Sequence, residues 1–422
     1  MKNKIEAEYK MRDPNDFRYS DLSTPTGQYL RSFWQPVYHI CDLESGHATP
    51  LRIMNQTFTL YRGESGDFHL TEARCPHRRT LLSTGRVEGE CISCFYHGWK
   101  FDSDGQCVEQ PAEDSEFAHK VKIQTYPTRQ YLGLVFAFLG EGVPPDFPIY
   151  PEFDQFDGLI EVDSYRRDCN FFHNLENALD MSHVEFVHGN NEAAFSGFGH
   201  GSRLSAIESD WGVEYSFKRE DGQLRINHFG MPNIFYMNAL PTDPDIGWQE
   251  SLFWWVPIDD GRHVQFSIHR VPIHGEARRR VSDKRQARRH EIDQSHLELC
   301  KEILEGRLRL QDVDPLRADI VRLQDDVAQL GQGIMADRTG ERLGRGDVGV
   351  IAIRKLWQRE LFAFETGHSL KNWRRDASIT PKTWGLAGDP PQTGVVEEGC
   401  EPDIVDVRPY IEIKEQMELH HN

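Results

Sequence analysis

The chain has 422 residues, which at roughly 150 residues per domain allows two or three domains with full-sized cores. Its 67 acidic residues outnumber 48 lysines and arginines, and the formal net charge of -19 excludes a dedicated nucleic-acid binder, which needs a basic surface. No apolar run reaches the roughly 18 residues of a membrane span, and the charged residues 1–16 do not resemble a secretory signal. We therefore expect a cytoplasmic protein with no nucleic-acid or membrane partner, whose eight cysteines stay reduced.

The first part of the chain is strand-like. Residues 57–61 (TFTLY) and 68–72 (FHLTE) partly alternate between apolar and polar side chains. Residues 133–140 (GLVFAFLG) have the composition of a buried strand. Because turns rich in Gly, Asp and Ser separate these segments, we expect a sheet domain built from short strands.

The second part of the chain mixes helical and strand-like segments. Residues 170–188 have helical apolar spacing and begin near a capping side chain, Asp168 or Asn170. Further along, three segments are strand-like, and a heavily charged helix follows them. The expected strands are 233–240, 251–258 and 263–273, and the charged helix is expected from about 282 to 308.

The change of pattern falls at the proline-rich residues 141–151 (EGVPPDFPIYP), which indicate a linker. We therefore predict an all-β domain at residues 31–142 and a larger mixed α+β domain at residues 143–422. The N-terminal segment, residues 1–30, is expected to pack on the body that these two domains form.

Four candidate metal ligands in the first domain form two short pairs. Cys75-Pro-His77 is followed, after sixteen residues, by Cys94-x-x-His97. Structural zinc sites usually group cysteines with cysteines and histidines with histidines, whereas each pair here is mixed. The mixed pairs favour a Rieske [2Fe–2S] cluster, in which two cysteines hold one iron and two histidines hold the other. The alternatives are a zinc site, or two buried cysteines and two surface histidines that hold no common metal.

A second group of candidate ligands lies in the predicted helix at 170–188. Asn177, Asp180 and His183 are three residues apart and therefore share one helical face. His188 lies about 140° from His183 on an ideal helix, so both reach one ion only if the helix bulges or ends there. Two imidazoles and one carboxylate form the facial triad of non-haem Fe(II) oxygenases. The alternative interpretation is a helix with two structural histidines.

At this point the sequence resembles a known family. Residues 75–107 (CPHRRTLLSTGRVEGECISCFYHGWKFDSDGQC) look like the Rieske domain of the Rieske non-haem iron aromatic-ring oxygenases. The D-x2-H-x4-H arrangement of Asp180, His183 and His188 is also similar to this family, and the resemblance extends over residues 30–367. The HRR and YHGWKFD runs are similar to the phthalate dioxygenase-like branch, which includes aromatic-acid O-demethylases. The resemblance implies an α+β fold, with an all-β Rieske [2Fe–2S] domain and a helix-grip catalytic domain whose antiparallel sheet is covered by helices.

The same resemblance implies the cofactors and the third iron ligand. Residues 321–333 (VRLQDDVAQLGQG) resemble the family's C-terminal ligand segment, in which the second acidic residue of a pair meets the iron. This selects Asp326, with Asp325 as the alternative, beside His183 and His188. One Rieske cluster and one mononuclear Fe(II) per chain are therefore expected.

Asp180 resembles the family's bridging aspartate. In that role it accepts one hydrogen bond from His183 and another from the Rieske ligand His97 of a neighbouring subunit. We expect Asp180 and Asn177, which share a helical face, to be the catalytic polar side chains beside the iron. A head-to-tail homotrimer, alone or stacked into a hexamer, also follows from the resemblance alone.

The expected function is that of a terminal oxygenase component acting with O2 on a small, carboxylated aromatic substrate. Because the sequence has no G-x-G-x-x-G fingerprint and no recognisable flavin or nicotinamide domain, electrons must come from a separate NAD(P)H-dependent reductase, with or without a ferredoxin. Mono-oxygenation such as O-demethylation is favoured. The alternatives are cis-dihydroxylation of a ring and a non-catalytic Rieske electron carrier.

Two further segments bear on the site. Residues 228–238 and 252–260 are rich in aromatic side chains and resemble strands that line the family's substrate pocket, although an ordinary sheet core has the same composition. Residues 278–289 carry seven lysines and arginines in an acidic protein. This basic cluster predicts either a solvated helix face or a docking surface for an electron donor or an adjoining subunit.

Overall fold

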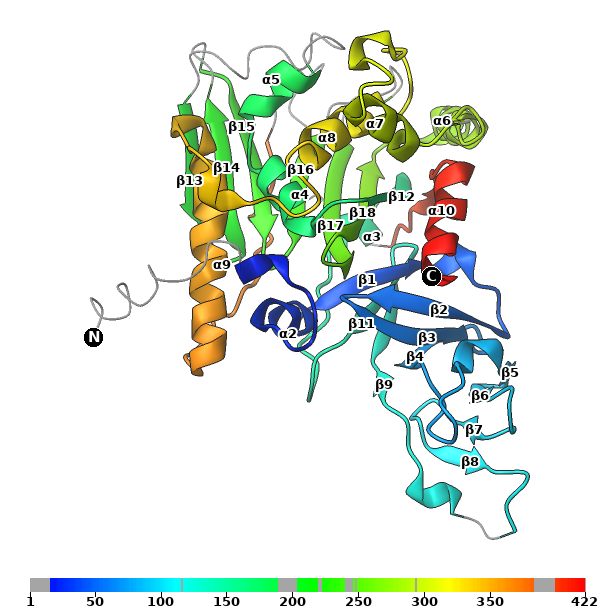
Figure 1. Cartoon of the computed structure of the whole chain (residues 1–422). Coiled ribbons are helices and arrows are strands. Elements are labelled where there is room, and N and C mark those ends of the chain that lie inside the picture. The colour runs from blue at the N-terminus through cyan, green and yellow to red at the C-terminus, as the bar shows by residue number, and fades with distance from the viewer. Residues whose placement is uncertain are drawn as a thin grey trace.

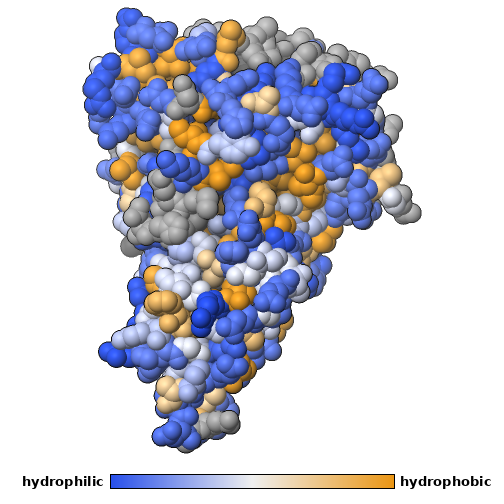
Figure 2. All heavy atoms as spheres, turned by 90° about the vertical axis from the view of Figure 1, so that its right-hand side faces the viewer, coloured by the Kyte–Doolittle hydropathy of each residue, from blue (hydrophilic) through white to orange (hydrophobic). Residues whose placement is uncertain are grey.

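The computed structural model describes residues 16–114, 117–188, 203–218, 222–239, 246, 249–292, 294–382 and 399–421. These residues form a broad body that tapers to a narrower, β-rich end (Figures 1 and 2). No helix among the described residues is long and apolar enough to cross a membrane.

The tapered end consists of three antiparallel sheets with the strand orders β1-β11-β10, β2-β3-β4-β9 and β5-β6-β7-β8, numbered along the chain. The strands are β1 (Trp34–His39), β2 (His47–Ile53), β3 (Gln56–Arg62), β4 (Phe68–Glu72), β5 (Arg86–Glu88), β6 (Cys91–Ser93), β7 (Lys100–Phe101), β8 (Cys107–Glu109), β9 (Thr125–Tyr126), β10 (Thr128–Tyr131) and β11 (Leu134–Phe138). The strands predicted at 57–61, 68–72 and 133–140 are confirmed as β3, β4 and β11.

The body is built on one large sheet. Its strands are β12 (Leu159–Arg167), β13 (Arg203–Glu208), β14 (Gly212–Lys218), β15 (Leu224–Gly230), β16 (Ile234–Ala239), β17 (Gln249–Asp259), β18 (Arg262–Val271) and β19 (Asp403–Asp406). The order is β13-β14-β15-β16-β17-β18-β12-β19. All pairs are antiparallel except β12 with β19, which run parallel at one edge. The three strands predicted for this domain are confirmed as β16, β17 and β18.

Helices cover this sheet, and the expected α+β fold is confirmed (Figure 1). The helices are α2 (Pro25–Arg31), α3 (Pro151–Asp154), α4 (Phe171–Ala178), α5 (Ser182–His188), α6 (Gly275–Arg288), α7 (His296–Leu304), α8 (Ile320–Leu330), α9 (Val348–Thr366) and α10 (Tyr410–His421). Helix α4 packs against β17 and β18 and contacts α8 and α9, while α9 packs against β13 and β14.

The single helix predicted at 170–188 is two helices, α4 and α5. Asn170 caps α4, because its side chain accepts a hydrogen bond from the N–H of Phe172. The break follows from local competition for backbone N–H groups. The Asp180 carboxylate accepts from the N–H of Ser182 at 2.9 Å, and the hydroxyl of Tyr215 accepts from the N–H of Met181 at 3.2 Å.

The charged helix predicted at about 282–308 is also two helices, α6 and α7. Helix α6 begins earlier, at Gly275, and ends at Arg288, and α7 begins at His296. Ser295 caps α7 by accepting a hydrogen bond from the N–H of Leu297. A Ser followed three residues later by Glu298 is a capping-box pattern, so the sequence did carry a signal for this second start.

The described N-terminal residues pack on both parts of the molecule. Phe17 stacks on Phe172 of α4 with ring centroids 3.9 Å apart, and Arg31 donates to the carbonyl of Met54 at 2.8 Å. One continuous core cluster includes buried side chains from the tapered end and from the body. The division at residues 30 and 142 therefore stays a prediction.

A buried ion pair ties α4 to the C-terminal half of the chain. Glu176 accepts from Arg338 at 2.9 and 2.8 Å and also pairs with Arg354 of α9. Burial alone would raise the pKa of Glu176, but the two guanidinium charges outweigh it and lower that pKa below its ordinary value of 4.5. Because the pKa is lower in the folded chain, ionised Glu176 stabilises the fold above pH 4.5, and this contribution is lost as the pH falls through the folded pKa.

We expect Glu176→Gln to lower the free energy of unfolding by about 3–5 kcal/mol at neutral pH, because two buried guanidinium groups lose their carboxylate. The difference from the unaltered protein should shrink as the pH falls below 4.5, where the unaltered side chain also loses its charge. Urea unfolding of both proteins at a series of pH values measures this difference. A difference that stayed constant over the whole series would contradict the assignment to Glu176.

Candidate metal centres

The four predicted Rieske ligands lie on two loops with the same backbone geometry, one between β4 and β5 and one between β6 and β7. In each loop the N–H of the cysteine donates to the carbonyl five residues later, and its own carbonyl accepts from the N–H four residues later. The fourth residue after each cysteine has a left-handed backbone, with φ of 62° at Arg79 and 71° at Gly98. A positive φ is unfavourable for an arginine and is typical of loops shaped by a functional site.

The two loops bring the predicted ligands together, with thiols inside and imidazoles outside. Cys75 and Cys94 are buried, while His77 and His97 are partly exposed and have ring centroids 4.5 Å apart. Burial, reinforced by the Cys94 thiol, raises the pKa of Cys75 to about 12, so this thiol needs a cation in order to lose its proton. Desolvation, together with His77 and Arg78, lowers the pKa of His97 and keeps that imidazole in its neutral, ligating form.

The surroundings of these loops fit an iron–sulfur cluster. Trp99 stacks on His77 with ring centroids 4.6 Å apart, and its indole Nε1–H is buried without a partner among the described residues. The hydroxyl of Ser93, directly before Cys94, is also buried without a hydrogen-bond partner among the described residues. Unpaired buried donors beside two thiols suit a group that carries sulfur acceptors.

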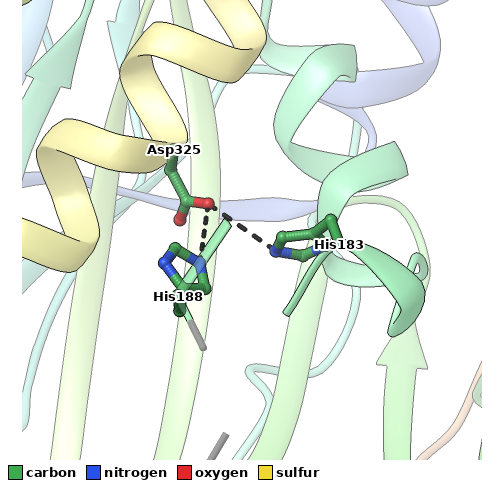
Figure 3. Close-up of side chains that lie close together, drawn as sticks. All are labelled: His183, His188 and Asp325. Carbon is green, nitrogen blue, oxygen red and sulfur yellow. Dashed lines mark ion pairs between the residues drawn. The ribbon is translucent and has the colours of Figure 1, made fainter. Parts of the chain in front are cut away.

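In the body, the predicted iron ligands His183 and His188 meet a carboxylate of α8 (Figure 3). Nε2 of His188 lies 3.2 Å and Nε2 of His183 lies 3.6 Å from Oδ1 of Asp325. One candidate ligand atom from each of the three residues lies within 4.8 Å of the others. Residues 183–188 form a regular α-helix, so no bulge separates the two histidines, and α5 as described runs to His188.

Protein oxygens fix the orientation of both imidazoles. Nδ1 of His188 lies 2.9 Å from Oε1 of Gln324, and Nδ1 of His183 is in close contact with the backbone carbonyl of Asp180. Because each Nδ1 faces a protein oxygen, Nε2 is the nitrogen that each ring turns toward Asp325, and it is the atom that would coordinate a metal once it carries no proton. Gln324 is not among the residues that the sequence predicted. Its position directly before the acidic pair was the only signal.

The Asp325 carboxylate is anionic and held from several sides. Burial alone would raise its pKa, but the hydrogen bond from His188 and the charge of Arg167 hold that pKa well below the usual range. Arg167 Nη2 lies 3.5 Å from Oδ2, and Asn177 Nδ2 donates to Oδ1 at 3.3 Å. An anionic, oriented carboxylate beside two imidazoles fits a divalent cation such as Fe(II). No pattern in the sequence indicated that Arg167 of β12 belongs to this site.

The expectation that Asp326 is the third ligand is corrected by this geometry. Asp326 is fully buried, its Oδ1 lies 2.7 Å from Nε of Arg167, and its Oδ2 is in close contact with Nδ1 of His296. Consecutive residues of a helix point about 100° apart, so only one of the two aspartates can face α5. The structure brings Asp325, and not Asp326, to His183 and His188.

Asp180 lies between α4 and α5. Its Oδ1 accepts from the N–H of Ser182 at 2.9 Å, and its Oδ2 lies 3.9 Å from Nδ1 of His183, which contacts the Asp180 carbonyl more closely. The side chain is 29% exposed, so a neighbouring chain can reach it. The bridge to His97 of another subunit therefore stays a prediction.

A cavity of about 350 Å³ is lined in part by Asp325. Its size lies within the range of roughly 300–1,000 Å³ that is usual for small-molecule sites. The cavity is lined by residues of β12, β17 and β18 and of the helices α6 and α8. Of the two segments expected to line a substrate pocket, 252–260 contributes Phe253. None of the described residues of 228–238 lines this cavity, because β15 and β16 lie toward the opposite edge of the sheet.

Comparisons with known proteins support the cluster site and the family. A family model described as Rieske [2Fe-2S] domain matches residues 33–127, which favours the cluster over zinc. The 5,5'-dehydrodivanillate O-demethylase oxygenase subunit of Sphingobium sp. (strain NBRC 103272 / SYK-6) is 29% identical over 370 residues, covering 84% of this chain and 81% of that protein. The phenoxybenzoate dioxygenase subunit alpha of Ectopseudomonas oleovorans is 30% identical over 374 residues, covering 82% of this chain and 83% of that protein.

A solved structure shares the fold over most of the chain. A variant oxygenase in the oxygenase–ferredoxin complex of carbazole 1,9a-dioxygenase superposes with a TM-score of 0.59 at 18% sequence identity. The match covers 89% of this chain and 99% of that oxygenase chain. The similarity therefore includes the tapered end and the body, and not only the segment that the family model matches.

Proposed function

Since the chain belongs to the Rieske non-haem iron oxygenases and is thus an oxidoreductase that uses O2, we propose that it mono-oxygenates a carboxylated aromatic compound. The observation that carries this proposal is the convergence of His183 and His188 on Asp325, which itself lines a cavity of about 350 Å³. A non-catalytic Rieske electron carrier would need neither the triad nor the cavity.

The residues described above have separate tasks in this proposal. Cys75, Cys94, His77 and His97 would hold the [2Fe–2S] cluster, and the triad would hold the mononuclear iron. When bound, the cluster supplies single electrons and the mononuclear iron activates O2. Asn177, Arg167 and Gln324 keep the triad oriented for a metal, and the cavity beside Asp325 would position the substrate.

The names of the relatives support the substrate class. One relative is named for O-demethylation of 5,5'-dehydrodivanillate and the other for dioxygenation of phenoxybenzoate, and both compounds are carboxylated aromatics. We favour mono-oxygenation such as O-demethylation, with cis-dihydroxylation as the second candidate. The same protein groups would serve both reactions.

The electron donor and the assembly are part of the proposal. We propose a separate reductase, with or without a ferredoxin, and the ferredoxin-bound neighbour supports such a partner. A head-to-tail homotrimer, alone or stacked into a hexamer, is supported by the position of the two sites within one chain, because the β5–β8 end and α5 lie at opposite ends of the molecule (Figure 1). Phe95 and Tyr96, directly before His97, are 75% and 52% exposed, which suits a surface that a neighbouring subunit covers.

Two further expectations remain proposals. We propose that the chain divides into the N-terminal segment 1–30, the cluster domain 31–142 and the catalytic domain 143–422, which is supported by the match of the family model to residues 33–127. We also propose the cytoplasm as its location, which is supported by the eight cysteines, none of which forms a disulfide.

A turnover screen tests the function. The purified protein, supplied with a surrogate reductase and NADH, is incubated with methoxylated and unsubstituted aromatic acids, and formaldehyde, phenols and cis-diols are quantified. We expect formaldehyde from a methoxylated acid, in roughly equal amount to the O2 consumed, and no product from a His183→Ala control. A cis-diol as the main product would favour dihydroxylation. Failure to oxidise any acid under conditions in which the reductase reduces the cluster would contradict the proposed function.

A further inference from the structure

The cavity beside Asp325 contains an arginine that has no partner among the residues that the structure describes. Arg288, in the last turn of α6, lines the cavity and is partly buried. Its guanidinium group makes no hydrogen bond, ion pair or aromatic contact, as far as the described part of the chain extends. A partly buried charge without a partner is unfavourable, so its retention at a cavity wall points to a ligand.

The other arginines near it have partners of their own. Arg278 pairs with Asp157, and Arg285 donates from Nε to Glu161 at 2.8 Å. Arg289 pairs with Asp406 at 3.1 Å. The basic cluster at 278–289 is thus neither a solvated face nor a docking surface along its whole length. Its inner side is built into the fold.

The acidic residues of the cavity wall do not neutralise Arg288 either. Four aspartates and glutamates line the cavity, and each has a different arginine as its partner. The pairs are Glu161 with Arg285, Asp163 with Arg322, Asp319 with Arg317, and Asp325 with Arg167. After these pairs are formed, Arg288 is the one basic group of the lining without an acidic partner among the described residues.

A second polar group in the cavity also lacks a partner. Gln249 of β17 is only 6% exposed, its Oε1 is buried without a hydrogen bond, and its amide makes no side-chain hydrogen bond within the described residues. Apolar side chains lie between these polar groups, among them Phe253, Val321 and Ile292. Apolar side chains beside unpaired polar groups suit a ring that carries a polar substituent.

We propose that Arg288 binds the carboxylate of the aromatic substrate, with the Gln249 amide as a second polar contact. This inference rests on the proposed function and names the group that selects an acid. A guanidinium group can donate two parallel hydrogen bonds to a carboxylate. Because Arg288 and Asp325 line the same cavity, an acid group held at Arg288 places the ring in the cavity that Asp325 lines.

The test measures binding, so it does not depend on turnover. The dissociation constants of p-methoxybenzoate, benzoate and biphenyl-3-carboxylate, and of their three neutral amides, are determined by calorimetry on the purified full chain. The proteins are the unaltered chain, Arg288→Gln, Arg288→Lys and the control Arg279→Gln. Arg279 lies on the same helix, is exposed and does not line the cavity.

We expect Arg288→Gln to weaken binding of the acids by about 10- to 100-fold and to leave binding of the amides within about two-fold. Arg288→Lys should give an intermediate loss, because the charge remains and the paired donors do not. Arg279→Gln should change neither. Since Arg288 has no partner among the described residues, the thermal midpoint of Arg288→Gln should be unchanged or higher, whereas a merely structural role would lower it.

Two results would overturn the inference: equal affinity of the unaltered protein for acids and amides, or acid binding unaffected by Arg288→Gln. These results are distinct from a failure of the proposed function. If neutral aromatics are oxidised while no acid binds, the chain is an oxygenase and Arg288 has another role. If no aromatic compound of either kind binds or is oxidised, the proposed function itself fails.

Discussion

Replacing Asp325 with asparagine is expected to remove the mononuclear iron and to lower turnover by at least about 100-fold, while the Rieske spectrum stays intact. The amide keeps the shape of the carboxylate but not its charge, and His183 and His188 alone hold a divalent cation weakly. The unaltered protein should contain about three irons per chain, two in the cluster and one at the triad. Asp325→Asn should contain about two.

The adjacent substitution, Asp326→Asn, should lower the stability of the protein and largely keep its mononuclear iron. Asp326 is fully buried between Arg167 and His296, and it raises the pKa of His296, whose burial alone would lower it. Asp326→Asn leaves these cationic groups without their carboxylate, so we expect it to cost about 3–5 kcal/mol of stability. Its iron content should stay closer to three per chain, because Asp326 does not contact His183 or His188.

Iron and acid-labile sulfide analysis, visible spectra and thermal unfolding of both variants test this pair of predictions. Each variant is the control for the other, because the two residues are adjacent and the substitution is the same. If Asp326→Asn lost the mononuclear iron and Asp325→Asn kept it, the ligand assignment would have to be exchanged.

This pair also marks what the sequence could and could not predict. The acidic pair after Gln324 was found from its resemblance to a family segment, and the two histidines were found from their spacing. The choice between the two aspartates depends on how α8 is rotated about its axis. That rotation is set by contacts from distant elements, with Arg167 of β12 and His296 of α7 holding Asp326 inward. Nothing in the segment 321–333 encodes these partners.

The fold was predicted best where the pattern is local. Alternating residues identified strands such as β3 and β4, and the mixed Cys-His pairs identified the cluster loops. The break between α4 and α5 depends on Tyr215, which is distant in sequence and takes the N–H of Met181. The cavity depends on the order of strands in the large sheet, which places β17, β18 and β12 together and β15 farther away. Periodicity does not determine strand order.

Asp180→Asn separates two roles of one carboxylate. Within the chain, Oδ1 of Asp180 accepts from the N–H of Ser182, and an asparagine oxygen can accept the same bond. The stability of the variant should therefore change by less than about 1 kcal/mol. If Asp180 also joins His183 to His97 of a neighbouring chain, the neutral amide cannot accept from both imidazoles in the same way. Turnover should then fall at least about 100-fold although the cluster and the mononuclear iron remain bound.

Mixed assemblies test whether the neighbouring chain is required. His97→Ala chains lack a complete cluster site, and His183→Ala chains lack a complete triad, so each variant alone should be inactive. Within one chain the two sites lie at opposite ends of the molecule (Figure 1), so electrons are expected to cross a subunit boundary. Trimers co-assembled from both variants contain boundaries where an intact cluster loop of one chain meets an intact triad of the next, and these should regain part of the activity. Adding Asp180→Asn to the His97→Ala chain, which supplies the intact triad, should abolish that recovery, whereas adding it to the His183→Ala chain should not. If verified mixed trimers stay inactive, electrons move within a single chain, and Asp180 has only its local role at the start of α5.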